Sequence, residues 1–195
     1  MRNSSSQLNE ILQRRVVQNS NMHEKVAFIT GSASGMGFAV AAVLSSHPTI
    51  DWNIHLIDSN EEAEKQASSK LKNASFHKTN ATDYKPSISA FKAAWNTHQR
   101  LDFVFVNAGI IKRDNFYTKH NLDGPPPPPT SQLSVDVNYK AVVNTSCPAL
   151  HCFPKSLVKH GREGSDPVLI MTSSQGAAST LRNSAWYILV VKPLS

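Results

Sequence analysis

A glycine-rich stretch near the start of the chain separates an apolar run, residues 26–29, from a helical pattern, residues 38–44. It reads Thr30-Gly-Ser-Ala-Ser-Gly-Met-Gly. Glycines allow a sharp turn and close approach of the backbone to a diphosphate, and a helix N-terminus offers N–H groups and a positive dipole end. The pattern predicts a dinucleotide-binding turn, although a plain strand–helix connection also fits it. The residues expected to line this turn are Gly31, Ser34, Gly35, Met36 and Gly37.

A second apolar run ends in an acid where such a fold would hold a ribose. Residues 53–58 predict a strand, and Asp58 at its end comes 21 positions after Gly37. A carboxylate there accepts hydrogen bonds from ribose hydroxyls and repels a 2′-phosphate. Neither Ser59 nor Asn60 supplies a cation for that phosphate, so the sequence favours NAD over NADP. The alternative is a solvated acid at a strand end.

Strand and helix patterns alternate from residue 24 onward. The pattern predicts strands at 25–30, 53–58, 74–79, 101–106 and 168–172, and helices at 35–46, 61–72, 86–98 and 131–146. Pro148 should kink or end the last helix, whose continuation reaches Lys159 before a loop at 160–166. Such alternation predicts an α/β, Rossmann-like, doubly wound parallel sheet with helices on both faces.

The chain divides into two parts by composition. The polar composition of residues 1–23 predicts a flexible N-terminal extension. The glycine turn and the alternating strands and helices of residues 24–195 predict one NAD-binding Rossmann domain. Within that domain, residues 111–131 interrupt the alternation and include five consecutive prolines at 125–129. Prolines fit neither a helix nor a central strand, so we expect an extended Pro-rich insertion.

Bulk properties argue against several other classes of protein. A chain of 195 residues with 40% hydrophobic content suits one domain with a full core. The net charge of +6 contains no basic block, which argues against nucleic-acid binding. No apolar run reaches the roughly 20 residues that span a bilayer, and no secretory signal is visible, so we expect a cytoplasmic protein without a membrane partner. Cys147 and Cys152 complete neither a zinc site nor a disulfide framework, so no metal is expected.

Taken together, these motifs resemble the short-chain dehydrogenase/reductase family over about residues 24–188. The turn fits the family's T-G-x-x-x-G-x-G, and Asp58 fits the ribose-binding acid of its NAD-using members. Val106 replaces the first Asn of the family's N-N-A-G motif, and Asn80 replaces the usual Asp of its adenine-contacting motif. Asp58 and the region 130–180 also resemble fungal relatives of NAD-dependent 15-hydroxyprostaglandin dehydrogenase. The further cofactor-binding residues that the resemblance implies are Asn80, Ala81, Asn107, Ala108 and Gly109.

The resemblance implies hydride transfer between a secondary alcohol or ketone and nicotinamide. Tyr187, 13 residues after Ser174, would be the general acid/base, because a nearby ammonium lowers a phenol pKa of about 10. Ser174 would donate a hydrogen bond to the substrate oxygen. Asn138 would hold a water that connects to the lysine. Each residue also has a structural alternative. Ser174 would then be a cap, Asn138 an ordinary helix residue, and Tyr187 a packing residue.

The catalytic lysine departs from the family's spacing of four residues after the tyrosine. Position 191 is Val, and Lys192 at i+5 would lie about 140° from Tyr187 on a regular helix. Pro193 disfavours a helix at Lys192. The run 187–191 looks more like a strand than a catalytic helix.

The chain stops at Ser195, before the later elements of the family. We therefore expect a truncated product, with a sheet incomplete at its C-terminal edge and strand 168–172 exposed. Three readings follow: an NAD-dependent oxidoreductase acting on a small-molecule alcohol or ketone, a catalytically inactive dinucleotide-binding protein, and an unstable fragment. A homo-oligomer is usual for the family but doubtful for this chain.

Overall fold

The computed structural model describes residues 23–111, 123–126, 128–129, 131–164, 166–174 and 186–191. The strands are β1 (His23–Thr30), β2 (Ile50–Asp58), β3 (Ala74–Lys78), β4 (Phe103–Val106), β5 (Val168–Ser174) and β6 (Trp186–Val191). The helices are α2 (Gly35–Ser45), α3 (Glu61–Ser68), α4 (Tyr84–His98), α5 (Leu133–Val135), the π-helix η1 (Asp136–Lys140) and α6 (Ala141–Gly164).

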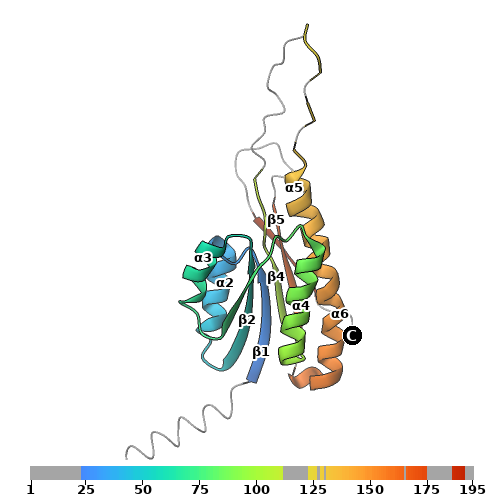
Figure 1. Ribbon diagram of the computed structural model, residues 1–195. Helices are drawn as coiled ribbons and strands as arrows, with labels where there is room; N and C mark the ends of the chain where they lie inside the picture. Colours follow the sequence, from blue (N-terminus) through green and yellow to red (C-terminus); the bar gives the residue numbers. More distant parts are fainter. Residues whose placement is uncertain are drawn as a thin grey trace, which may run out of the picture.

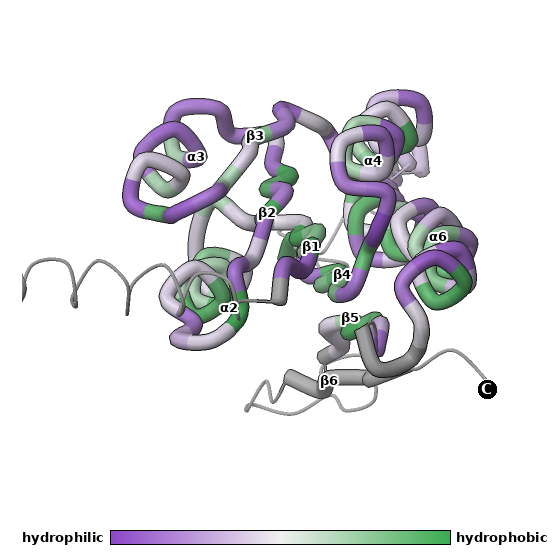
Figure 2. Tube along the Cα trace, turned by 90° about the horizontal axis from the view of Figure 1, so that it is seen from below, coloured by the Kyte–Doolittle hydropathy of each residue, from purple (hydrophilic) through white to green (hydrophobic). Residues whose placement is uncertain are grey.

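All six strands form one sheet in the order β3-β2-β1-β4-β5-β6. The first five are parallel, and β6 is antiparallel to β5. Helices α2 and α3 cover one face, and α4 and α6 cover the other (Figures 1 and 2). The strand order reverses between β1 and β4, because β2 and β3 lie on one side of β1 whereas β4 and β5 lie on the other. Doubly wound sheets bind ligands at such a switch point. The expected Rossmann-like fold is confirmed.

Strand β1 lies at the centre of both hydrophobic cores. Val26 and Phe28 belong to the core beneath α4 and α6, where the Phe28 ring stacks on Phe91 at 3.9 Å between centroids. Ala27 and Ile29 belong to the core beneath α2. Because successive side chains of a strand face opposite ways, a strand covered on both sides needs an unbroken apolar run.

The C-terminal edge differs from the expectation. Strand 168–172 is not an exposed edge, because β6 pairs along β5, with Thr172 opposite Ile188 and Ser173 opposite Tyr187. The strand pattern read at 187–191 is confirmed. The family's helical placement of Tyr187 is therefore wrong for this structure, since the apolar, β-branched run pairs with β5 instead.

The long helix also differs from the expectation. Pro148 does not end it, because α6 continues through Pro148 and Pro154 to Gly164. Within the loop expected at 160–166, residues 160–164 are therefore part of the helix, apart from non-helical backbone at Gly161. A proline inside a helix costs about 3 kcal/mol. Phe153, fully buried against the sheet between the two prolines, shows how packing of the inner face offsets that cost.

The Pro-rich insertion lies mostly outside the described residues. Between its two ends at Ile111 and Ser131, its described residues, 123–126 and 128–129, are exposed and form neither helix nor strand. Figure 1 shows them beyond the carboxyl end of the parallel strands, above α5. No helix of the described part of the chain has the length and apolar character needed to cross a bilayer.

Candidate functional site

The glycine turn, residues 31–37, packs against the loop that follows β4. Gly31 has φ +66°, and a Cβ there would lie 2.9 Å from the Ala108 Cα. A Cβ on Gly37 would overlap the carbonyl oxygen of Gly31. Gly35 also has positive φ, at +55°, but a Cβ there would meet nothing within 4 Å. The turn is therefore tight on its inner side and open on its outer side.

The open side of the turn presents the N-terminus of α2. Ser34 caps the helix without a side-chain hydrogen bond, and the first turn of α2 contains no acid. The first N–H groups of a helix have no intrahelical acceptor, and they carry the positive end of the dipole. Ser34, Gly35 and Met36 are all exposed there. This cradle fits a diphosphate, as expected for the group that the glycine pattern implies.

Asp58 at the end of β2 ties the turn to the next connection. Its Oδ2 accepts a hydrogen bond from the Ala33 N–H at 3.1 Å, and its Oδ1 accepts one from the Asn60 N–H at 3.0 Å. A carboxylate offers about four lone-pair positions. Two remain for ribose hydroxyls, so the half-buried Asp58 fits the expected role beside the turn.

The expected adenine-contacting residues lie beside Asp58, after β3. The Thr79 N–H donates to the Asp58 carbonyl at 2.9 Å, which fixes the start of this loop. The Asn80 side chain accepts from the Thr82 N–H at 3.1 Å and from its hydroxyl at 2.9 Å. Asn80 is exposed and Ala81 half-buried. Because β3, β2 and β1 are parallel, this loop lies at the same edge of the sheet as the glycine turn.

The loop after β4 is held by a threonine from β1. The buried Thr30 Oγ1 accepts from the Asn107 N–H at 3.0 Å and from the Ala108 N–H at 3.2 Å. The Asn107 amide donates to the Gly31 carbonyl at 3.3 Å and accepts from the Thr172 hydroxyl at 3.2 Å. The ends of β1, β4 and β5 therefore form one polar cluster. Thr172 was not predicted, because a hydroxyl at a strand end has no distinctive spacing.

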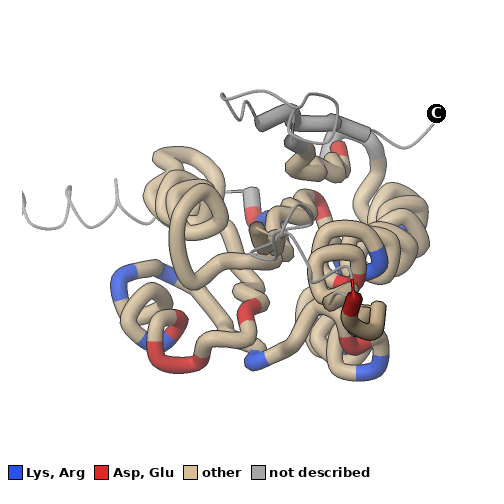
Figure 3. The backbone as a smooth tube through the Cα atoms, turned by 90° about the horizontal axis from the view of Figure 1, so that it is seen from above, with Lys and Arg blue, Asp and Glu red and all other residues tan. Residues whose placement is uncertain are grey.

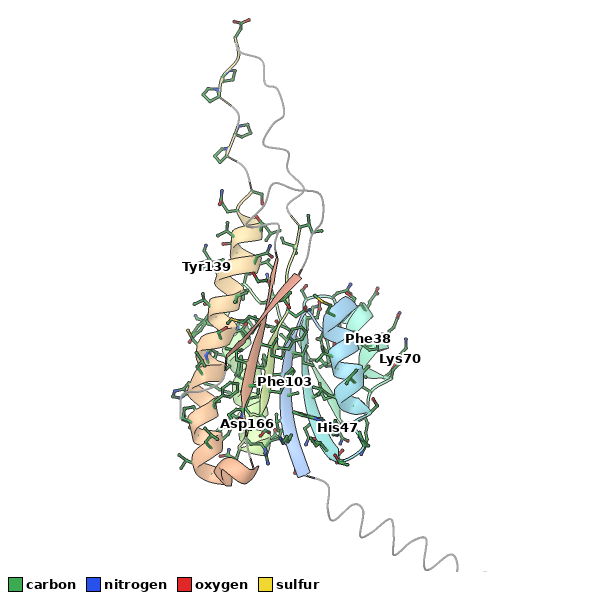
Figure 4. All side chains as sticks on the ribbon, turned by 180° about the vertical axis from the view of Figure 1, so that it is seen from behind. Phe38, His47, Lys70, Phe103, Tyr139 and Asp166 are labelled. Atoms are coloured by element: carbon green, nitrogen blue, oxygen red, sulfur yellow. The ribbon has the colours of Figure 1, made fainter. Side chains whose placement is uncertain are left out.

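Asn138 lies in the π-helix η1 and clamps the backbone of Ile110. Its Nδ2 donates to the Ile110 carbonyl at 2.8 Å, and its Oδ1 accepts from the Ile110 N–H at 2.9 Å. π-Helical turns occur frequently at functional sites. In Figure 4, the neighbouring Tyr139 lies towards the carboxyl end of the strands, as does Phe38 in the first turn of α2. The fold therefore brings Asn138 and the glycine turn to one edge, next to Gly109.

The remaining catalytic candidates lie at the end of β5 and in β6. Ser174 ends β5, and the backbone register pairs it with Trp186, the neighbour of Tyr187. The register sets Tyr187 directly opposite Ser173, one position from the partner of Ser174, and successive positions of a strand face opposite sides of the sheet, so the pairing does not bring Ser174 and Tyr187 together. Lys192 lies outside the described residues.

A buried acid beneath the turn was not predicted as a site residue. Glu64 of α3 has 0% exposure, and both of its carboxyl oxygens lie 3.2 Å from the Ser32 hydroxyl that donates to them. Burial raises the pKa of Glu64 to about 7, the negative Asp58 adds to the rise, and the Ser32 hydrogen bond opposes it. In the sequence, Glu64 looks like one of three acids in the first turn of a helix, which gives no hint of burial.

The described residues form neither a basic face nor a metal-binding group. Figure 3 shows Lys and Arg spread over separate elements rather than gathered on one face. Within the described ranges, no group of three His, Cys, Asp or Glu side chains is arranged to hold a metal ion.

Comparison with known proteins gives one family. The sequence model described as short chain dehydrogenase matches residues 25–187. The short-chain dehydrogenase/reductase prx7 of Penicillium rubens is 39% identical over 145 residues, which cover 72% of this chain and 49% of prx7. The short-chain dehydrogenase/reductase ascJ of Acremonium egyptiacum is 34% identical over 128 residues, covering 65% and 41%. The chain therefore spans about half the length of these relatives, or less.

Solved structures share the fold. The 3-ketoacyl-(acyl-carrier-protein) reductase of Brucella melitensis, in complex with NADH, matches with a TM-score of 0.62 and 21% identity, covering 78% of this chain and 58% of that one. A short-chain type dehydrogenase/reductase of Mycobacterium marinum matches with a TM-score of 0.63 and 18% identity, covering 83% and 60%.

Proposed function

The chain belongs to the short-chain dehydrogenase/reductase family, and from that premise we propose that it is an NAD-dependent oxidoreductase interconverting a secondary alcohol and a ketone. One observation carries the proposal. The glycine turn has no room for a side chain on Gly31 or Gly37, opens at the N-terminus of α2, and lies against the Asp58 carboxylate. A diphosphate and its adjoining ribose need these two features side by side.

The electrostatics of the ribose site support NAD rather than NADP. A carboxylate at the end of β2 attracts ribose hydroxyls and repels a 2′-phosphate. Lys78, at the end of the neighbouring β3, is paired with Glu61 at 2.9 Å. A 2′-phosphate would therefore be repelled by the Asp58 carboxylate, and the Lys78 ammonium, already paired with Glu61, would not neutralise it.

The proposed chemistry uses residues at the carboxyl edge of the sheet. The nicotinamide, when bound, accepts or supplies the hydride. Ser174 donates a hydrogen bond to the substrate oxygen, and Tyr187 moves the proton to or from it. This chemistry needs an ammonium beside the Tyr187 phenol to lower its pKa, and Lys192 is the candidate that the sequence offers. Asn138 fixes the loop after β4 through Ile110 and holds a water that connects to Lys192.

Asp58→Ala tests the cofactor assignment. We expect the Kd for NADH to rise about 10- to 100-fold, because hydrogen bonds to a charged group contribute about 1.5–3 kcal/mol, whereas the Kd for NADPH should change far less. Fluorescence titration of both dinucleotides measures the change. Asp51→Ala removes the same charge at the opposite end of β2 and should leave both affinities unchanged. An unaltered preference in Asp58→Ala would refute the NAD assignment.

A second candidate is a dinucleotide-binding protein without turnover. It is favoured by the position of Tyr187 in β6, which removes the one-turn helical relation between tyrosine and lysine. NADH formation from a panel of secondary alcohols separates the two. Turnover that is lost in Tyr187→Phe, with NADH affinity retained, supports the oxidoreductase. Saturable NADH binding without turnover in the unaltered chain supports the second candidate.

A further inference from the structure

We propose that Glu64 is a positioning residue of the dinucleotide site and takes up a proton when the dinucleotide binds, so that cofactor affinity rises as the pH falls through neutrality. The inference rests on the proposed function, because it needs a diphosphate at the glycine turn. It concerns a residue that contacts the turn from beneath, on the side opposite the ligand.

The geometry places a carboxyl group directly under the turn. Glu64 and Ser32 each have 0% exposure, and the Ser32 hydroxyl donates to both Glu64 oxygens at 3.2 Å. Ser32 directly follows Gly31, whose carbonyl oxygen lies against Gly37. The Glu64 side chain therefore holds the innermost part of the turn.

A second carboxyl group holds the next residue of the turn. Ala33 donates its N–H to Asp58 at 3.1 Å, so two consecutive residues, Ser32 and Ala33, are bound by two acids. The two acids repel each other, since the negative Asp58 contributes to the raised pKa of Glu64. Binding of a ligand at the turn acts on both acids at once.

The turn and the neighbouring Glu61 add no second group beneath the turn that titrates near neutral pH. Residues 31–37 contain no titratable side chain. On α3 itself, the carboxyl of Glu61 pairs with Lys65 at 2.7 Å and with Lys78 at 2.9 Å, and hydrogen bonds from these lysines lower its pKa to about 2. Glu61 therefore stays ionised at neutral pH, and Glu64 is the acid beneath the turn that titrates there.

The sign of the effect follows from charge. A diphosphate brings two negative charges to the outer side of the turn, which disfavours ionised Glu64 and raises its pKa above 7. The complex then holds more protons than the free protein, so affinity falls as pH rises. A rise of about one pKa unit gives uptake of about half a proton at pH 7.5, and about tenfold weaker binding at the alkaline limit than at the acid limit.

Calorimetry of NADH binding to the full chain in two buffers of different ionisation enthalpy counts the protons. We expect uptake of about half a proton at pH 7.5 for the unaltered chain. Glu64→Gln keeps the size and a polar group for Ser32 but cannot titrate, so uptake should vanish and its NADH affinity should not change between about pH 6.5 and 8.5. Glu62→Gln removes an exposed charge from the same helical turn and should keep the full uptake.

The outcomes separate this inference from the proposed function. Binding of NADH without proton uptake in the unaltered chain, or undiminished uptake in Glu64→Gln, overturns the role of Glu64 and leaves the proposed function standing. Absence of NADH binding to the unaltered chain overturns the proposed function and this inference with it. Should Glu64→Gln not fold, as judged by circular dichroism, the proton count of the unaltered chain still decides.

Discussion

Replacing Asp102 by alanine is expected to lower the free energy of unfolding by about 3–5 kcal/mol, the cost of breaking a buried ion pair from one side. The Asp102 side chain is 1% exposed and accepts two hydrogen bonds from Arg100, both at 2.7 Å. Its Oδ2 also accepts the Val26 N–H at 2.8 Å. Alanine would leave the Arg100 guanidinium and the buried Val26 N–H without this acceptor. Urea denaturation measures the loss.

Two further variants show whether burial causes the effect. Asp51→Ala also removes the acid of an ion pair, with Lys72 at 2.9 Å, but these side chains are 36% and 62% exposed, so the loss should stay below about 1 kcal/mol. Asp102→Asn keeps one oxygen as an acceptor and should fall between the two. Equal losses in Asp102→Ala and Asp51→Ala would contradict the role assigned to Asp102.

The parallel sheet could be predicted because its strands are buried on both faces. Val26, Ala27, Phe28 and Ile29 alternate between two cores, and that requirement is visible as an unbroken apolar run. The tight glycine turn could also be predicted from the sequence. A Cβ on Gly37 would overlap the carbonyl oxygen of Gly31, and Gly31 itself has φ +66°, so both requirements act within a few residues of sequence and appear as a glycine pattern.

The unpredicted features depend on contacts between distant segments. Asp102 and Glu64 look like ordinary acids in the sequence. Only the fold brings them within hydrogen-bond distance of the Val26 N–H and the Ser32 hydroxyl, respectively. The pairing of β6 with β5 depends on register across the sheet, which the local pattern at 187–191 cannot specify. Pro148 marks a helix end by local rules, yet packing of the inner face of α6 overrides it.

Gly37→Ala is expected to weaken NADH binding about 10- to 100-fold while the sheet stays folded. The added Cβ would overlap the Gly31 carbonyl oxygen and lie 2.8 Å from its carbonyl carbon, so the backbone of the turn must move. Overpacking of this kind costs about 1–3 kcal/mol, which corresponds to that range of affinity when the cost falls on the binding conformation. NADH titration, with circular dichroism on the same sample, measures both properties.

Val43→Ile adds one carbon to the same helix at a side chain that is 66% exposed, and it should leave NADH affinity unchanged. Gly35→Ala tests the effect of backbone conformation without steric overlap, since the added Cβ would meet nothing within 4 Å while φ at this position is +55°. It should lower stability by about 1–2 kcal/mol through strain. NADH affinity preserved in Gly37→Ala would mean that the dinucleotide does not need the tight inner side of this turn. The diphosphate would then have to bind elsewhere on the sheet edge, and the proposed function would lose the observation that carries it.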